Sequence, residues 1–228
     1  MEKGLTGAKL KWIAIVTMLI DHIGAVVIAQ KLANMGISLD ATVNHWLIWI
    51  YWVCRLIGRL SFPLFLFLLI EGFTHTKNVY RYGLNLFLFA LISEIPFDLA
   101  VSNTMFYWNN QNIFFTLFLG LILLVFIKNQ NKLISIVLIL VFGLINEYLI
   151  FGDYGLYGII LLGGMYLLKK DVPARNIFVI IVGTYYQLTQ GLSFLFMNQY
   201  NGQRGKQNKA FFYLFYPIHL LILQIIAR

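Results

Sequence analysis

The chain has 228 residues, of which 60% are hydrophobic and only 11% are charged, and its formal net charge is +8. About a quarter of the residues in an ordinary soluble domain are charged, so this composition excludes a soluble globular protein and indicates an integral membrane protein. The basic residues are dispersed among short connections and form no separate basic domain, which argues against nucleic-acid binding.

At about 20 residues per crossing, the length allows roughly eight membrane-spanning helices and leaves no room for an extramembrane module. Residues 1–228 are therefore expected to form a single transmembrane domain, an all-α polytopic integral membrane protein. Apolar runs bounded by polar or Gly- and Pro-rich breaks predict spans near residues 10–30, 46–72, 82–100, 112–127, 133–151, 154–168, 176–196 and 210–227. Since the fourth and sixth are short for a crossing, the number of full crossings stays open.

The first span, LKWIAIVTMLIDHIGAVVIAQ, carries Asp21 and His22 near its middle. It is longer than the apolar region of a signal peptide and is interrupted by this polar pair, so we interpret it as a retained span. Ionisable residues inside a membrane are energetically costly and indicate a functional site or an ion-pair network. Neighbouring side chains point about 100° apart on a helix, so Asp21 could orient the imidazole through a neighbour or hold an arginine.

Later spans carry further ionisable residues at a similar depth, as judged from a rise of about 1.5 Å per residue. These are Arg55, Arg59, Glu94, Glu147 and His219. Prolines 63, 96 and 217 lie within four residues of three of them, and a proline frees a backbone carbonyl that only protein, water or a ligand can satisfy. We therefore expect Pro-broken helices around a central polar site, although both arginines could equally serve only to neutralise Asp21 and Glu94.

Residues nearer the predicted ends of the spans allow two interpretations. Glu71 could be an interfacial capping residue or a site residue, and His45 and His75 are expected to be solvated in loops. The sequence contains no cysteine and histidine cluster, and no metal site is predicted.

The distribution of basic residues predicts an N-terminus on the cytoplasmic side. In an eight-span arrangement, the inner side receives Lys3, Lys9, Lys11, Lys77, Arg81, Lys128, Lys132, Lys169, Lys170, Arg175 and Arg228. The outer side receives Lys31, Arg204, Lys206 and Lys209. The last three lie in the loop over residues 198–209 and violate the rule that basic residues are concentrated on the cytoplasmic side. In the alternative arrangement, one short segment is re-entrant and this loop lies on the inner side.

Five stretches resemble, in chain order, the TraX family of membrane proteins: LKWIAIVTMLIDHIG, GRLSFPLFLFLLIEGF, LISEIPFDL, DYGLYGIILL and FFYLFYPIHLLIL. The resemblance implies a bacterial protein of the cytoplasmic (inner) membrane, because the family is associated with N-terminal acetylation of conjugative pilin. TraX proteins in turn look like compact relatives of the acyltransferase family 3 membrane enzymes. That larger family has a basic residue, ten others and then a histidine in its first span, and Lys11 and His22 have this spacing.

This resemblance implies a membrane-embedded O- or N-acyltransferase that uses acetyl-CoA or another acyl-CoA. His22 would be the general base or nucleophile, with Asp21 beside it, and Lys11 would meet CoA phosphates. Arg55 or Arg59 would stabilise the thioester oxyanion or bind phosphate. Other candidates for substrate or CoA binding are Glu71, Glu94, Glu147, Arg204, Lys206 and His219.

The expected acceptor is a peptide amine or an envelope polymer such as a surface glycan or lipid head group. The chain is shorter than members of the larger family and carries no soluble acceptor-recognition domain. A proton-coupled small-molecule transporter is the competing hypothesis, because central ionisable residues and broken helices also occur in carriers.

Overall fold

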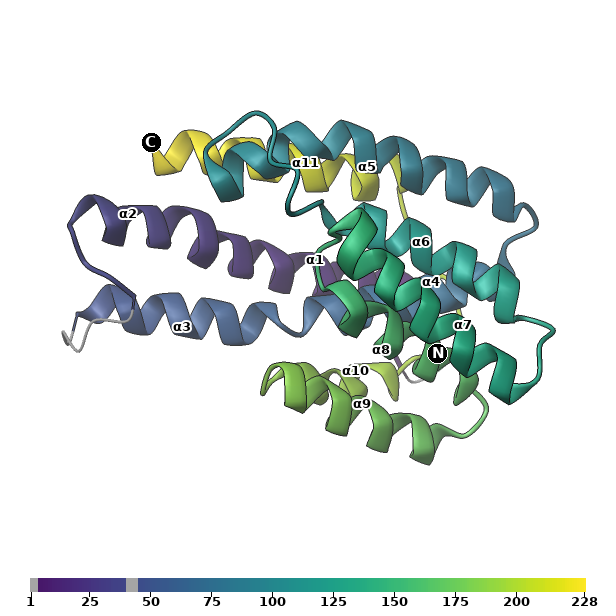
Figure 1. Ribbon diagram of the computed structural model, residues 1–228. Coiled ribbons are helices and arrows are strands. Elements are labelled where there is room, and N and C mark those ends of the chain that lie inside the picture. The colour runs from purple at the N-terminus through teal and green to yellow at the C-terminus, as the bar shows by residue number, and fades with distance from the viewer. Residues whose placement is uncertain (1–3, 40–44) are drawn as a thin grey trace.

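The computed structural model describes residues 4–39 and 45–228, and these residues form helices joined by turns (Figure 1). The described part contains no β-strand beyond two isolated bridges, which confirms the all-α class. The long helices are α1 (Gly7–His22), α3 (Trp46–Gly58), α4 (Ser61–His75), α5 (Val79–Ser102), α6 (Ile113–Ile127), α7 (Lys132–Ile145), α8 (Gly155–Leu167), α9 (Val172–Tyr186) and α11 (Lys209–Ala227). Shorter segments are η1 (Ile23–Ile28), α2 (Ala29–Asn34), η2 (Asn146–Ile150), η3 (Gln190–Ser193) and α10 (Phe194–Met197).

Polar side chains determine where many of these helices begin. Each accepts a hydrogen bond from a backbone N–H in the first turn, a group that would otherwise lack a partner. These residues are Thr6, His45, Asn78, Asn112, Asn131, Asp171 and Asn208. His45 is thus a capping residue of α3. From the sequence, only a solvated loop histidine was expected at this position.

Five helical stretches in the described residues are long and apolar enough to cross a membrane: residues 7–34, 46–75, 79–102, 132–150 and 209–227. The apolar helices α6 and α8 are shorter. These five long apolar stretches support a polytopic membrane protein. They do not confirm the predicted eight crossings. Many large apolar side chains are exposed along α3, α5 and α7, as lipid-facing surfaces require, while most apolar side chains of α4 are buried.

The span predicted over residues 176–196 is wrong, because α9 ends at Tyr186 and the chain turns back through η3 and α10. The returning arm is held close by small residues: a side chain at Gly183 would meet the backbone of Gly191. At the tip of this hairpin, the Thr189 hydroxyl donates a hydrogen bond to the Leu56 carbonyl of α3 at 2.5 Å. The hairpin is therefore re-entrant, and its two ends lie at the same end of the molecule.

The loop that follows this hairpin lies against the N-terminus. The amides of Gly7 and Ala8 donate to the carbonyls of Gln203 and Arg204 at 2.8 and 2.9 Å, so the loop supplies partners for the first turn of α1. The eight-span arrangement placed this loop on the other side from the N-terminus, and the structure corrects it. The re-entrant alternative, which was left open, is the one that the structure contains.

Basic residues gather at this N-terminal end of the molecule, where the loop, the start of α1 and the turns after α4, α6 and α8 lie. The described ones are Lys9, Lys11, Lys77, Arg81, Lys128, Lys132, Lys169, Lys170, Arg175, Arg204, Lys206 and Lys209. At the other end, a chain of side-chain amide hydrogen bonds runs from Gln224 through Asn103 to Gln30 and Asn34. Arg228 lies there, together with Lys31, and not with the basic cluster as predicted.

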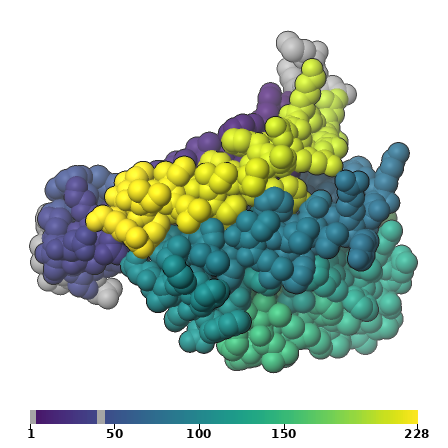
Figure 2. Space-filling model, turned by 90° about the horizontal axis from the view of Figure 1, so that it is seen from above, coloured from purple at the N-terminus to yellow at the C-terminus, as the bar shows by residue number. Residues whose placement is uncertain are grey.

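The helices α6, α7 and α8 stop part-way along the molecule. The Asn112 side chain, at the start of α6, donates to the carbonyl of Ala90 at 2.8 Å, about 18 Å before α5 ends. Gln111 pairs in turn with Gly152, in the turn between η2 and α8. The molecule is consequently broad at the N-terminal end and narrower toward α2, with α11 lying along α5 (Figures 1 and 2).

Candidate functional site

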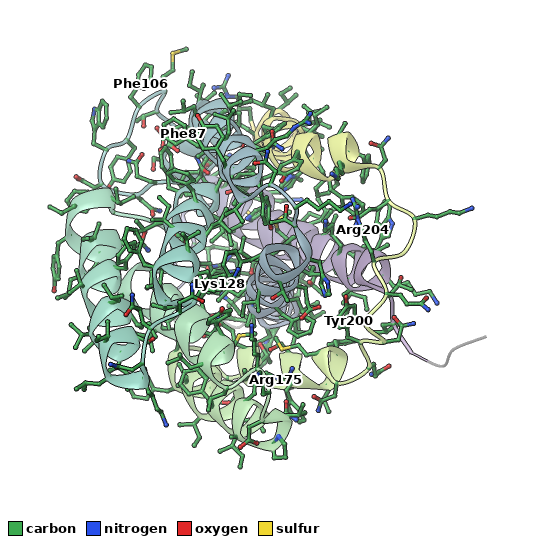
Figure 3. All side chains as sticks on the ribbon, turned by 90° about the vertical axis from the view of Figure 1, so that its right-hand side faces the viewer. Phe87, Phe106, Lys128, Arg175, Tyr200 and Arg204 are labelled. Carbon is green, nitrogen blue, oxygen red and sulfur yellow. The ribbon has the colours of Figure 1, made fainter. Side chains whose placement is uncertain are left out.

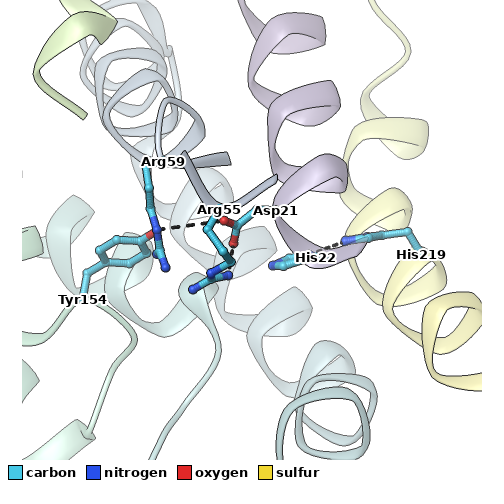
Figure 4. A network of polar contacts seen from close by, with 6 residues as sticks. All are labelled: Asp21, His22, Arg55, Arg59, Tyr154 and His219. Carbon is cyan, nitrogen blue, oxygen red and sulfur yellow. Dashed lines mark hydrogen bonds and ion pairs between the residues drawn. The ribbon is translucent and has the colours of Figure 1, made fainter. Parts of the chain in front are cut away.

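A pair of histidines lies at mid-depth, where the short helices stop. His22 is the last residue of α1 and His219 lies in the middle of α11. Nδ1 of His22 lies 2.6 Å from Nε2 of His219, and the rings stack with centroids 4.9 Å apart and planes 10° apart (Figure 4). The helix widens to the π-helical η1 directly after His22, and such turns are frequent at functional sites.

The hydrogen bonds around this pair determine which nitrogen carries each proton. Nδ1 of His219 lies 2.7 Å from the carbonyl oxygen of Phe215, which can only accept, so Nδ1 of His219 carries a proton. In neutral His219, Nε2 is then an acceptor, and Nδ1–H of His22 donates to it. Nε2 of neutral His22 is left with its lone pair free, as a general base or nucleophile requires.

Asp21 contacts Arg55 of α3 and Arg59, which caps the C-terminal end of α3, and no contact joins it directly to the imidazole of His22. Its Oδ2 atom lies 2.6 Å from Nη1 of Arg55, and Oδ1 lies 3.9 Å from Nε of Arg59 (Figure 4). The three side chains are 11%, 21% and 14% exposed, respectively. Of the two roles that the sequence left open for Asp21, the structure shows the arginine-binding one.

Tyr154 completes the cluster and was missed by sequence reasoning. Its hydroxyl accepts a hydrogen bond from Nη1 of Arg59 at 3.5 Å, and its ring stacks on Phe62 at a centroid distance of 3.7 Å. The backbone of Tyr154 has φ 65°, a conformation that non-glycine residues rarely adopt and that often marks functional sites. The motif DYGLYGIILL was selected for its resemblance to the family, but only the fold shows that the turn containing Tyr154 reaches the arginines.

A glycine makes the approach between α1 and α3 possible. A Cβ atom at Gly58 would overlap the Cβ of Asp21, so only glycine lets the carboxylate reach Arg55 and Arg59.

We expect Gly58→Ala to lower the free energy of unfolding by about 1–3 kcal/mol, because the added methyl group must separate α1 from α3. Chemical unfolding in detergent measures this difference. Gly83→Ala is the matched control: it also lies inside a helix, but its Cβ would meet the nearest side chain at an ordinary 3.6 Å. Equal stability of the two variants would contradict the required close approach.

Lys11 lies at the N-terminal end of α1, about 16 Å along the helix from His22. Its Nζ atom donates to Oε1 of Gln207 at 2.8 Å and lies 5.0 Å from the ring centroid of Phe212. Arg204 is one of its charged neighbours, and Lys206 is exposed on the same loop. The structure thus brings Arg204 near Lys11, apart from the histidine pair, and Lys206 follows two residues along the same loop.

Two of the predicted site residues hold the first turns of helices. Glu94 accepts hydrogen bonds from the backbone and side-chain nitrogens of Asn112, and so fixes the start of α6. Glu147 is exposed, and its Oε2 atom accepts from the backbone amide of Leu156 at 2.8 Å, in the first turn of α8. Glu147 lies where α7 and η2 end, at the level of the histidine pair, but its side chain is exposed and does not join the cluster.

Glu71 lies at the N-terminal end, about 18 Å along the helix from Arg59, and is not part of the mid-depth cluster. Its Oε2 atom lies 3.5 Å from Nε2 of His75, and the side chain of His75 is 67% exposed, as expected for a solvated histidine.

Fold and site together define an all-helical membrane protein with a histidine pair and an arginine–carboxylate cluster inside the helix bundle. The family described as TraX protein matches residues 6–227, so the chain belongs to the TraX family. It is also 28% identical over 246 residues to the probable fimbrial assembly protein FimC, serogroup H1, of Dichelobacter nodosus, an alignment that covers 94% of this chain and 93% of that relative. No solved structure matches.

Proposed function

We propose that this chain is a membrane-embedded acyltransferase that moves an acyl group, in the simplest case acetyl, from acyl-CoA to an amine or hydroxyl acceptor. The observation that carries the proposal is the bonded pair of His22 and His219, which leaves Nε2 of His22 free at mid-depth. A buried, oriented imidazole beside two arginines is the combination that acyl transfer needs.

In the proposed reaction, Nε2 of His22 takes a proton from the acceptor nitrogen or oxygen as that atom attacks the thioester carbonyl carbon. Arg55 or Arg59 stabilises the negative charge that develops on the carbonyl oxygen. The carbon–sulfur bond then breaks, and the proton on His22 passes to the departing CoA thiolate. His219 is a positioning residue, since it fixes the tautomer of His22 and does not touch the reacting atoms. Attack by His22 itself, through an acyl-histidine, would use the same geometry.

The basic N-terminal end of the molecule is suited to bind acyl-CoA, the proposed acyl donor, because CoA carries phosphate groups. The excess of Lys and Arg at this end supports a cytoplasmic location for it in the bacterial inner membrane, and acyl-CoA is made in that compartment. Lys11, Arg204 and Lys206 would then meet the CoA phosphates, while the pantetheine arm spans the roughly 16 Å to His22.

The acceptor is the less constrained part of the proposal. The name of the relative refers to fimbrial assembly, which favours a pilin-like peptide amine. An envelope polymer with a free hydroxyl or amine would be served by the same base.

Acetyl-CoA turnover in lipid nanodiscs tests the proposal. We expect the wild-type protein to release CoA thiol when a pilin-like peptide is added, and the peptide to gain an acetyl group. Lys11→Gln should raise the CoA concentration needed by about tenfold, because a phosphate contact is lost, whereas the exposed neighbour Lys9→Gln should behave like the wild type.

Absence of acetyl-CoA binding together with absence of thiol release would overturn the acyltransferase proposal. Proton-coupled solute flux in proteoliposomes would then identify a carrier. Broken and short helices also occur in carriers, so the fold is compatible with that function as well.

A further inference from the structure

A polar pocket opens at the N-terminal end of the molecule, apart from the histidine pair. It has a volume of about 240 Å³ and lies between α4, α8, α9 and the segment that follows α10. Its polar lining comes from Glu71, Lys169, Arg175, Asn198 and Tyr200. Figure 3, which looks onto this end, shows Arg175 and Tyr200 on the same side of the molecule, with Arg204 farther along the loop.

Arg175 is the buried charge of this pocket. The residue is only 7% exposed, and its guanidinium donates to Oδ1 of Asn198 at 2.9 Å and to Oδ1 of Asn176 at 3.2 Å. The buried Nε atom has no hydrogen-bond partner, and within the described ranges no carboxylate forms an ion pair with Arg175. Glu71 attracts this guanidinium without forming an ion pair with it, and a buried cation that lacks a close counter-charge is costly, so the pocket is suited to an anion.

Lys169 adds a second positive charge to the same pocket. Its Nζ atom lies 4.2 Å from the ring centroid of Tyr166. Burial, reinforced by the nearby charge of Lys170, lowers the pKa of Lys169, as expected where cations gather without enough anions.

The carboxylate of Glu71 attracts both cations and offsets their charge only in part, because it also has other partners. It contacts His75 and interacts with the hydroxyl of Tyr200, whose pKa is raised to about 12 by burial and by this carboxylate. With one carboxylate against Lys169 and Arg175, the lining remains net positive.

We propose that this pocket binds a phosphate group carried by a larger molecule. The planar fork of an arginine suits phosphate oxygens, and Lys169 supplies a second charge. Phe67, Met165 and Met197 form an apolar wall for the rest of the ligand. At the end of the helix bundle, such a phosphate belongs either to a lipid head group or to CoA, and neither source requires that acyl transfer occurs.

Binding to the full-length protein, delipidated and held in detergent, tests the proposal without any turnover. Native mass spectrometry measures binding of dioleoyl phosphatidylglycerol, with phosphate-free dioleoylglycerol as the reference, and equilibrium dialysis measures binding of CoA that carries no acyl group. We expect one of the two phosphate compounds to bind about tenfold more weakly to Arg175→Gln and to Lys169→Gln. Lys170→Gln is the matched control, since that neighbouring lysine is exposed and does not line the pocket.

Weaker lipid binding identifies a head-group phosphate, and weaker CoA binding identifies CoA. If the wild type binds neither compound, or if all variants bind equally, the pocket is not a phosphate site. Should Arg175→Gln fail to fold, Lys169→Gln decides alone, because Lys169 is only half-buried.

Discussion

Acetyl-CoA turnover is expected to fall about 10² to 10⁴-fold in His22→Ala, because the variant lacks the nitrogen that accepts the proton of the nucleophile. Thiol release in nanodiscs, with the acceptor present, measures this loss. His75→Ala is the matched control: its side chain is 67% exposed, it lies far along α4 from the cluster, and its turnover should be unchanged.

His219 is predicted to act through His22, and a pair of substitutions separates this role from simple packing. His219→Ala removes the acceptor of the Nδ1–H bond of His22, so the imidazole can adopt the wrong tautomer, and turnover should fall about tenfold or more. His219→Gln offers a side-chain oxygen that can accept the same bond and should restore part of the rate. Equal loss in both variants would assign His219 a packing role only, and full activity of His22→Ala would remove His22 from the mechanism.

Asp21→Asn is expected to lower the free energy of unfolding by about 3 kcal/mol, since it removes the carboxylate that pairs with the mostly buried Arg55 and Arg59 and leaves only the more distant Asp153 to attract them. Chemical unfolding in detergent micelles measures the change. Asp171→Asn is the control, because Asp171 is exposed and caps α9. This substitution should lower the free energy of unfolding by about 1 kcal/mol or less.

The double variant Asp21→Asn with Arg55→Gln tests the cause of this loss. If an unpaired charge dominates the cost, removing that charge should recover part of the stability, and the two substitutions should not add. Additive losses would mean that Asp21 stabilises α1 through packing, independently of the arginines.

Local patterns were sufficient for the membrane class and for the core of the candidate site. Asp21, His22, Arg55, Arg59 and His219 were selected because ionisable residues in apolar helices are costly, and all five lie in the mid-depth cluster. Glu147 was selected by the same argument and is exposed, because position along a span gives the depth of a side chain and does not give the direction in which it points.

The sequence by itself determined that this chain is a helical membrane protein of the TraX family with charged groups inside its spans, since composition, apolar run length and motif order are local properties of the chain. Only the tertiary structure decided that residues 172–197 turn back, that the loop after them caps α1, and that Asp21 binds arginines while His219 binds His22. The reason is physical: a hairpin and a full span bury similar apolar sequences, and hydrogen-bond partners far apart in the chain are chosen by packing between helices.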